Sequence, residues 1–60
     1  MRRGDLVFVT LLSGERAKVV VWDVLESSVL VCTPVAYDAA LKSGRKPRTV
    51  GYREWALEPA

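Results

Sequence analysis

Short apolar runs separated by turn-forming residues dominate the first half of the chain. Three runs are rich in the β-branched and aromatic residues that favour strands: Asp5–Leu12, Arg16–Leu25 and Val29–Pro34. The connections between them, Ser13–Glu15 and Glu26–Ser28, are short, and the first carries a glycine. Because connections this short join antiparallel neighbours, the pattern predicts a three-stranded meander.

The second half of the chain predicts a longer connection followed by two short strands. Asp38 is a candidate N-cap for a short run of helix formers, and Gly44 is a stop signal after it. The pattern therefore predicts one short helical turn or a structured loop around residues 38–43. We expect a fourth strand over Arg48–Arg53, and a 3₁₀ turn within Glu54–Pro59 that leads into a last short strand.

A chain of 60 residues is long enough for one small domain. We expect residues 1–60 to form a single all-β domain, a five-stranded SH3-like barrel. An OB-like barrel is the alternative, although that fold normally needs more residues. The single cysteine, Cys32, excludes an internal disulfide, so oligomerisation is the usual aid to stability that stays open to so small a domain.

The apolar runs are too continuous to leave one face of each strand polar. Side chains alternate between the two faces of a strand, so two apolar sets are expected. One set, which lies inside the barrel unless the two faces are swapped, is Val7, Val9, Leu11, Val19, Val21, Val29 and Val31. The other set is Leu6, Phe8, Val20, Trp22 and Leu30, with Cys32 beside it.

The second apolar set predicts a covering partner. A patch of this kind normally exceeds what a monomer leaves in water, and covering a few hundred Å² gains several kcal/mol at roughly 25 cal/mol per Å². We therefore expect another chain to cover it, most simply a second copy in a homo-oligomer. The alternative is that the segment from Val35 to Pro47 folds over the patch.

The charges are nearly balanced in number but unevenly placed. Nine basic and seven acidic residues give a net charge of +2, yet four of the basic ones fall between Lys42 and Arg48 without an acid among them. Such a loop can contact phosphates without reading bases, and aromatic residues beside cations suit single-stranded nucleic acid. The candidate nucleic-acid contacts are Lys42, Arg45, Lys46, Arg48, Arg53, Tyr37 and Tyr52. The alternative is a solvated loop that keeps the protein soluble.

Three aromatic residues, Tyr37, Tyr52 and Trp55, lie in or near the long connection and the last element. In SH3-like barrels these regions lie close together and often form a ligand groove, which suits a peptide as well as a nucleic acid. Trp55 is followed by Ala56 and Leu57, and core packing is the favoured interpretation for it.

Candidate catalytic residues are sparse. There is no histidine for general-base chemistry near neutral pH, and Cys32 lies in an apolar strand where a thiol is typically inert. No cofactor or metal pattern is present in the sequence. We favour a non-enzymatic binding module. The alternatives are a protein-docking accessory subunit and an enzyme whose site forms only at a subunit junction. The free thiol and the lack of an export or membrane-spanning segment predict a cytoplasmic protein.

The two ends of the chain resemble those of small bacterial SH3-like barrels. The stretches that carry the resemblance are GDLVFV, residues 4–9, and TVGYREWALEP, residues 49–59. The resemblance implies a fold more than a function, since this fold serves many functions.

Two enzymatic groups of related architecture are also similar in part. MRRGDLVFV, residues 1–9, is similar to the first strand of MazF/PemK-type endoribonuclease toxins, and Arg3 is the residue on which that likeness rests. RTVGYREWALE, residues 48–58, is similar in placement to the Val-Gln-Ile-Tyr strand of type II plasmid-borne dihydrofolate reductases. Tyr52 is kept there, but the glutamine and isoleucine are not, so this likeness implies an oligomer of similar style rather than reductase activity.

Overall fold

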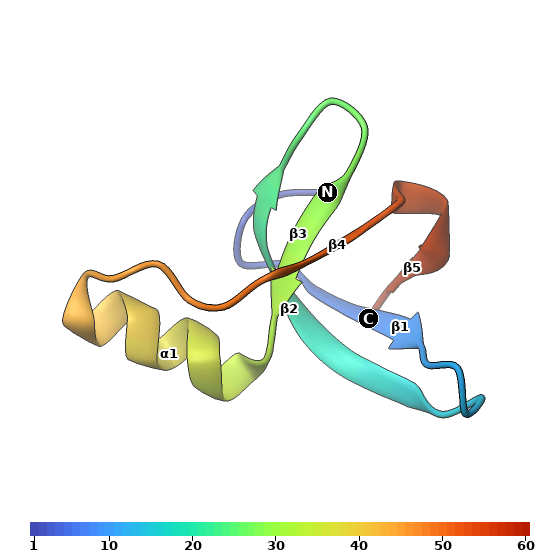
Figure 1. Cartoon of the computed structure of the whole chain (residues 1–60), viewed down its shortest axis with the longest axis horizontal. Coiled ribbons are helices and arrows are strands. Elements are labelled where there is room, and N and C mark those ends of the chain that lie inside the picture. Colours follow the sequence, from blue (N-terminus) through green and yellow to red (C-terminus); the bar gives the residue numbers. More distant parts are fainter.

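Five antiparallel strands form one sheet in the computed structural model, which describes residues 1–60 (Figure 1). The strands are β1 (Leu6–Thr10), β2 (Arg16–Val24), β3 (Val29–Cys32), β4 (Val50–Tyr52) and β5 (Leu57–Pro59), in the order β4-β3-β2-β1-β5. Helix α1 (Pro34–Ser43) joins β3 to β4, and the 3₁₀ turn η1 (Glu54–Ala56) joins β4 to β5. The predicted fold class, all-β with five strands and one short helical element, is confirmed.

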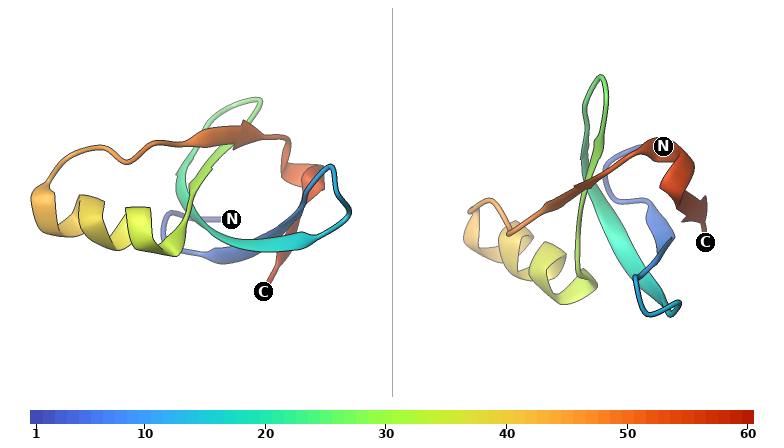
Figure 2. Two further views of the ribbon diagram at one scale, coloured as in Figure 1. Left: turned by 60° about the horizontal axis from the view of Figure 1, so that its bottom comes forward. Right: turned by 45° about the vertical axis from the view of Figure 1, so that its right-hand side comes forward.

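The sheet curls into an open half-barrel, and its inner face holds the hydrophobic core (Figure 2). The core side chains are Val7, Val9, Val19, Val21, Val29, Val31 and Leu57. Leu57 comes from β5, and the other six belong to the first of the two apolar sets that strand alternation predicted. The sequence left open which set faces inward, and the structure places six of the seven members of this set inside. Leu11 is the exception: β1 ends at Thr10, and Leu11 in the following turn is 41% exposed.

Helix α1 begins at Pro34, earlier than the sequence predicted. The hydroxyl of Thr33 accepts a hydrogen bond from the Ala36 N–H at 3.1 Å, so Thr33 is the N-cap. Proline at the first helical position has the required φ and needs no hydrogen-bond acceptor there. The predicted N-cap at Asp38 is therefore wrong, and the helix has 10 residues rather than a turn or two.

The predicted helix stop is confirmed at Gly44. Its φ of 72° lies in the left-handed region, and its N–H donates to the Ala40 carbonyl at 2.8 Å. Neither this helix nor η1 has the length and apolar character needed to cross a membrane.

Helix α1 packs against β2, and residues of the outer face of the sheet are buried on that side. Val20 and Cys32, which pair across β2 and β3, are each 4% exposed, and Ala40 of the helix is 5% exposed. The expectation that the whole second apolar set is open to a partner chain is wrong at Val20 and Cys32. These two residues fit the alternative prediction, in which the segment from Val35 to Pro47 folds over the patch, since they are buried on the side where α1 packs against β2.

Candidate nucleic-acid interface

A one-residue bulge in β2 places Trp22 at the centre of the candidate site. Val21 pairs with Val31 and Asp23 pairs with Leu30, so Trp22 is the extra residue without a partner. A bulge interrupts the ladder and redirects the local side chains. The Nε–H of Arg3 donates to the Trp22 carbonyl at 2.6 Å, which satisfies the acceptor at the bulge.

Two further contacts hold the Trp22 indole ring. The guanidinium carbon of Arg3 lies 4.7 Å from the ring centroid, and the Tyr37 ring meets it edge-on at 5.9 Å with an angle of 76°. Both arrangements are favourable for an aromatic face and edge. Because Arg3 comes from the N-terminal segment and Tyr37 from α1, three separate parts of the chain converge on Trp22.

Gly4 allows the N-terminal segment to approach this closely. Its φ is +92°, and a Cβ built on it would lie 3.3 Å from the hydroxyl oxygen of Tyr37. Its N–H donates to the Val21 carbonyl at 2.8 Å, next to the bulge. A residue with a side chain is disfavoured here by both the backbone angle and the space, so Gly4 is what positions Arg3 over the indole.

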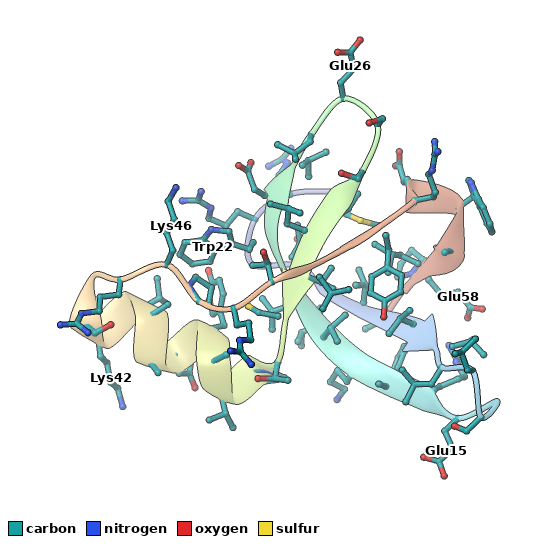
Figure 3. The ribbon with its side chains drawn as sticks, viewed as in Figure 1. Glu15, Trp22, Glu26, Lys42, Lys46 and Glu58 are labelled. Carbon is teal, nitrogen blue, oxygen red and sulfur yellow. The ribbon has the colours of Figure 1, made fainter.

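A hollow of about 580 Å³, which we term the Trp22 groove, opens beside this cluster. It is lined by Arg3, Trp22, Asp23, Leu30, Lys46, Pro47 and Thr49. Its charged lining residues are therefore two cations and one carboxylate, beside one aromatic ring. Figure 3 shows Lys46 next to Trp22, while Lys42 points to the other side of α1. The groove can hold a flat ring against apolar atoms and an anion against Arg3 or Lys46.

The predicted nucleic-acid residues do not form one surface. Lys46 lines the Trp22 groove, and the Tyr37 ring contacts the indole edge-on without lining the groove. Arg48 and Tyr52 line a different hollow that faces the interior of the half-barrel. Arg53 lies at the corner formed by η1, beside Trp55. The expectation of one groove containing Tyr37, Tyr52 and Trp55 is therefore wrong.

Lys42 and Arg45 stay exposed at the end of α1. Lys42 belongs to the last helical turn, where a cation complements the helix dipole. The Arg45 N–H donates to the Ser43 hydroxyl at 3.3 Å, one residue past the Gly44 cap. Arg45 thus lies next to Lys46 in the loop that borders the groove, whereas Lys42 faces away.

Trp55 is on the surface, and the prediction that it packs in the core is wrong. Its side chain is 85% exposed, while Leu57 is 6% exposed and joins the core cluster. The 3₁₀ turn Glu54–Ala56 causes the difference, because it lets the chain reverse direction before β5 begins. Leu57 is then the first residue in register with β1, opposite Val9.

The five residues of the predicted partner interface differ in how they are covered. Leu6 is 46% exposed, Val20 is buried, and Trp22 and Leu30 are half-buried walls of the Trp22 groove. Phe8 is half-buried, and the charged ends of Arg16 and Lys18 lie over its ring. The structure does not bring the five together as one open apolar face.

Sequence reasoning missed Arg3 and Trp22 as partners in a binding site. It placed Trp22 in an oligomer interface, and Arg3 entered only through the resemblance to ribonuclease toxins. The run Val19–Trp22 contains no sign of a bulge, because a bulge depends on where β3 pairs. The closeness of residues 3, 22 and 46 is a property of the folded chain alone.

Few side chains of this chain are suited to acid–base or metal chemistry. Burial raises the pKa of the Cys32 thiol above its ordinary value, which disfavours the nucleophilic thiolate. No group of three metal-ligating side chains gathers in the chain. No family model, curated protein or solved structure matches the chain, so no relative supplies a function for this site.

Proposed function

We propose that this chain is a binding module for single-stranded nucleic acid, with the Trp22 groove as its contact surface. The observation that supports the proposal is the convergence of Arg3, Trp22 and Lys46 in one hollow. Proteins that bind single strands combine aromatic stacking surfaces with cations that follow the phosphates. The Trp22 groove provides one aromatic ring and two cations for these two kinds of contact.

In the proposed complex, a base lies on the plane formed by Arg3 and Trp22. A guanidinium that covers an indole offers a flat, cationic surface on which an unpaired base can stack. Lys46 and the adjacent Arg45 then contact phosphates on either side of that base. Asp23 repels phosphate from the opposite wall, so the backbone runs along the Lys46 side of the groove.

A single-tryptophan variant provides the direct test. The chain has two tryptophans, and replacing the exposed one in Trp55→Phe leaves Trp22 as the only indole fluorophore. Titration with a labelled thymidine oligonucleotide is expected to quench Trp22 emission in a saturable way. The affinity should fall as salt rises, with a log–log slope of about −0.7 for each phosphate contact.

A matched pair of charge deletions locates the contact surface. Lys46→Ala should weaken binding and reduce the salt slope by about 0.7, because one phosphate contact is lost. Arg53→Ala removes the same charge at the η1 corner and should leave both quantities unchanged. Absence of quenching at low salt, or equal losses from the two variants, would contradict the proposal.

Self-association stays a prediction, but the apolar surface exposed for it is smaller than the sequence suggested. Val20 takes no part because its own chain buries it, and Leu6 is the member of the predicted interface with a large exposed fraction, 46%. Two or more linked copies would raise the avidity of a shallow groove for a long strand. Sedimentation velocity over a range of concentrations tests this, and a particle of one-chain mass throughout would exclude it.

A protein-docking surface is the second candidate function, and the exposure of Trp55 favours it. Trp55 borders a hollow of about 210 Å³ that is also lined by Val24 and Leu25, of which Leu25 is 47% exposed. Tryptophan is enriched among the residues that carry the binding energy of protein interfaces. A pull-down with the wild type and Trp55→Ala separates the two functions, since the variant should lose a docked protein and retain oligonucleotide binding.

A further inference from the structure

The interior side of the half-barrel contains a second hollow, which we term the inner groove. It has a volume of about 420 Å³, and nine of its eleven lining residues are hydrophobic. Val9, Val19 and Val31 line it and belong to the inner-face core. Cys32 and Ala36 at the start of α1 also line it, and it shares no lining residue with the Trp22 groove. A volume of this size falls within the range of small-molecule sites, about 300–1,000 Å³.

Two apolar residues that line the inner groove stay in contact with water. Leu11 is 41% exposed, and Val50 on edge strand β4 is 56% exposed. Tyr52, two residues farther along β4, adds an aromatic wall. Covering such surface with a ligand's hydrocarbon is favourable by roughly 25 cal/mol per Å².

The polar lining of the inner groove consists of Arg48 and Thr33. Arg48 has no acidic partner, since the ion pair between Arg16 and Glu58 is the one the chain contains, and its side chain takes part in no hydrogen bond. The Thr33 hydroxyl oxygen accepts from the Ala36 N–H, which leaves its own hydrogen free to donate. Both groups therefore present donors to a ligand.

No acidic residue opposes these donors. None lines the inner groove, and none occurs in the first turn of α1, which starts directly after Thr33. A neutral apolar ligand would leave the Arg48 guanidinium unpaired, and a bare phosphate would leave the apolar walls uncovered. A ligand that satisfies both parts of the lining carries a hydrocarbon body and one anionic group, for which a carboxylate matches the planar guanidinium.

We infer that the inner groove binds a small apolar carboxylic acid. Its hydrocarbon covers the exposed Leu11 and Val50 side chains and the Tyr52 ring, above the buried valines of β1, β2 and β3. Its carboxylate accepts hydrogen bonds from Arg48, whose planar fork matches two carboxylate oxygens, and from Thr33. This assigns Arg48 a role separate from nucleic acid. Because the two grooves share no lining residue, the inference does not depend on the proposed function.

The test compares three eight-carbon probes of equal length on the full chain: octanoate, octanol and octylamine. Methyl NMR spectra should show saturable shifts at Val9, Val19, Val31 and Val50. Octanoate should bind about tenfold or more tightly than octanol, because a hydrogen bond to a charged group is gained, and octylamine should bind more weakly than either. Hexanoate should lose roughly fourfold in affinity for each methylene removed.

Arg48→Gln identifies the carboxylate partner. This variant should bind octanoate no more tightly than octanol, whereas Arg45→Gln, in the same loop but outside the inner groove, should keep the wild-type preference. Amide spectra of each variant show whether it is folded, and Arg48→Lys, which keeps the charge, should restore part of the preference.

Two results would overturn the inference. One is equal affinity of the wild type for octanoate, octanol and octylamine, which would rule out recognition of the carboxylate. The other is the absence of saturable shifts at the four valines in millimolar octanoate. Quenching of Trp22 by the oligonucleotide should be unchanged when octanoate is present, so failure of one proposal is distinguishable from failure of the other.

Discussion

The outer face of the sheet has two halves that are covered in different ways. Around Val20 the chain uses helix α1, which leaves that side chain 4% exposed. Around Phe8 it uses charged side chains: the guanidinium carbon of Arg16 lies 4.6 Å and the Lys18 ammonium 5.9 Å from the ring centroid. Arg16 also pairs with Glu58 at 2.6 Å.

This difference shows that one chain can cover the two halves of an apolar outer face by different means. The helix excludes water from the Val20 half, which then behaves as a second small core. Long charged side chains cover the Phe8 half with their apolar stems while their charged ends remain in water, and each exposed cation over an aromatic ring contributes only about 0.5–1 kcal/mol. The two halves should therefore respond very differently to the same substitution.

The largest effect is expected from a charge placed under the helix. Val20→Asp puts an unpaired carboxylate in a buried site, which should cost at least about 3 kcal/mol and unfold so small a domain. Leu6 is the cross-strand partner of Val20 in the β1–β2 pairing but is 46% exposed, so Leu6→Asp should cost about 1 kcal/mol or less. Urea unfolding followed by circular dichroism compares the two, and equal losses would mean that α1 does not cover Val20.

A moderate effect is expected from removing the N-cap that holds the helical cover. Thr33→Ala should lower the free energy of unfolding by about 1 kcal/mol, because the Ala36 N–H loses its acceptor. Thr33→Ser keeps the hydroxyl and should recover most of that loss. Asp38→Ala should change stability by no more than about 0.5 kcal/mol, since Asp38 is within the helix and caps nothing. Chemical unfolding gives the free energy of unfolding of the three variants. If Asp38→Ala lost the most stability, Thr33 would not be the N-cap.

A small effect is expected from the ion pair that covers Phe8. The Arg16 and Glu58 side chains are 52% and 62% exposed, so Glu58→Gln should cost less than about 1 kcal/mol. The loss should shrink at high salt, where exposed charges are screened. Glu15→Gln removes a carboxylate that makes no ion pair and is the matched control. A loss at Glu58 that is large and insensitive to salt would show that the Phe8 half is as water-free as the Val20 half.

The smallest effect is expected in alkaline solution and comes from Cys32, which belongs to the helix-covered half. Burial raises the pKa of its thiol, so the folded chain holds this proton more tightly than the unfolded chain does. The resulting stability is present below the ordinary thiol pKa and is lost as pH rises through the raised pKa. Urea unfolding of the wild type and Cys32→Ala over a pH series checks this. Their stability difference should be constant near neutral pH and should shift against the wild type at high pH, and a constant difference throughout would contradict the burial.

Much of the fold was predictable because local patterns specify it. Valines at alternating positions in β1, β2 and β3 identified one apolar set, and short polar turns identified the antiparallel meander. The η1 turn and the last strand were also expected from their residues. The start of α1 was misplaced because Pro34 suits the end of a strand and the first turn of a helix equally well.

The candidate site was much less predictable than the fold. The basic residues from Lys42 to Arg48 are close together in the sequence, yet in the folded chain Lys46 lines the Trp22 groove and Arg48 lines the inner groove. Trp55 was assigned to the core because apolar neighbours follow it, but η1 turns it into solvent. The residues adjacent to a long side chain in the sequence do not determine which groove that side chain lines.

The sequence by itself determined the strands, the two alternating apolar sets and the unequal placement of charge, because each depends on residues a few positions apart. Only the tertiary structure decided what covers the second apolar face, where the Trp22 bulge forms and which cations meet an aromatic ring. These features depend on contacts between residues 3, 22, 37 and 46, which distant segments bring together. Such contacts result from packing the whole chain, and no local pattern encodes them.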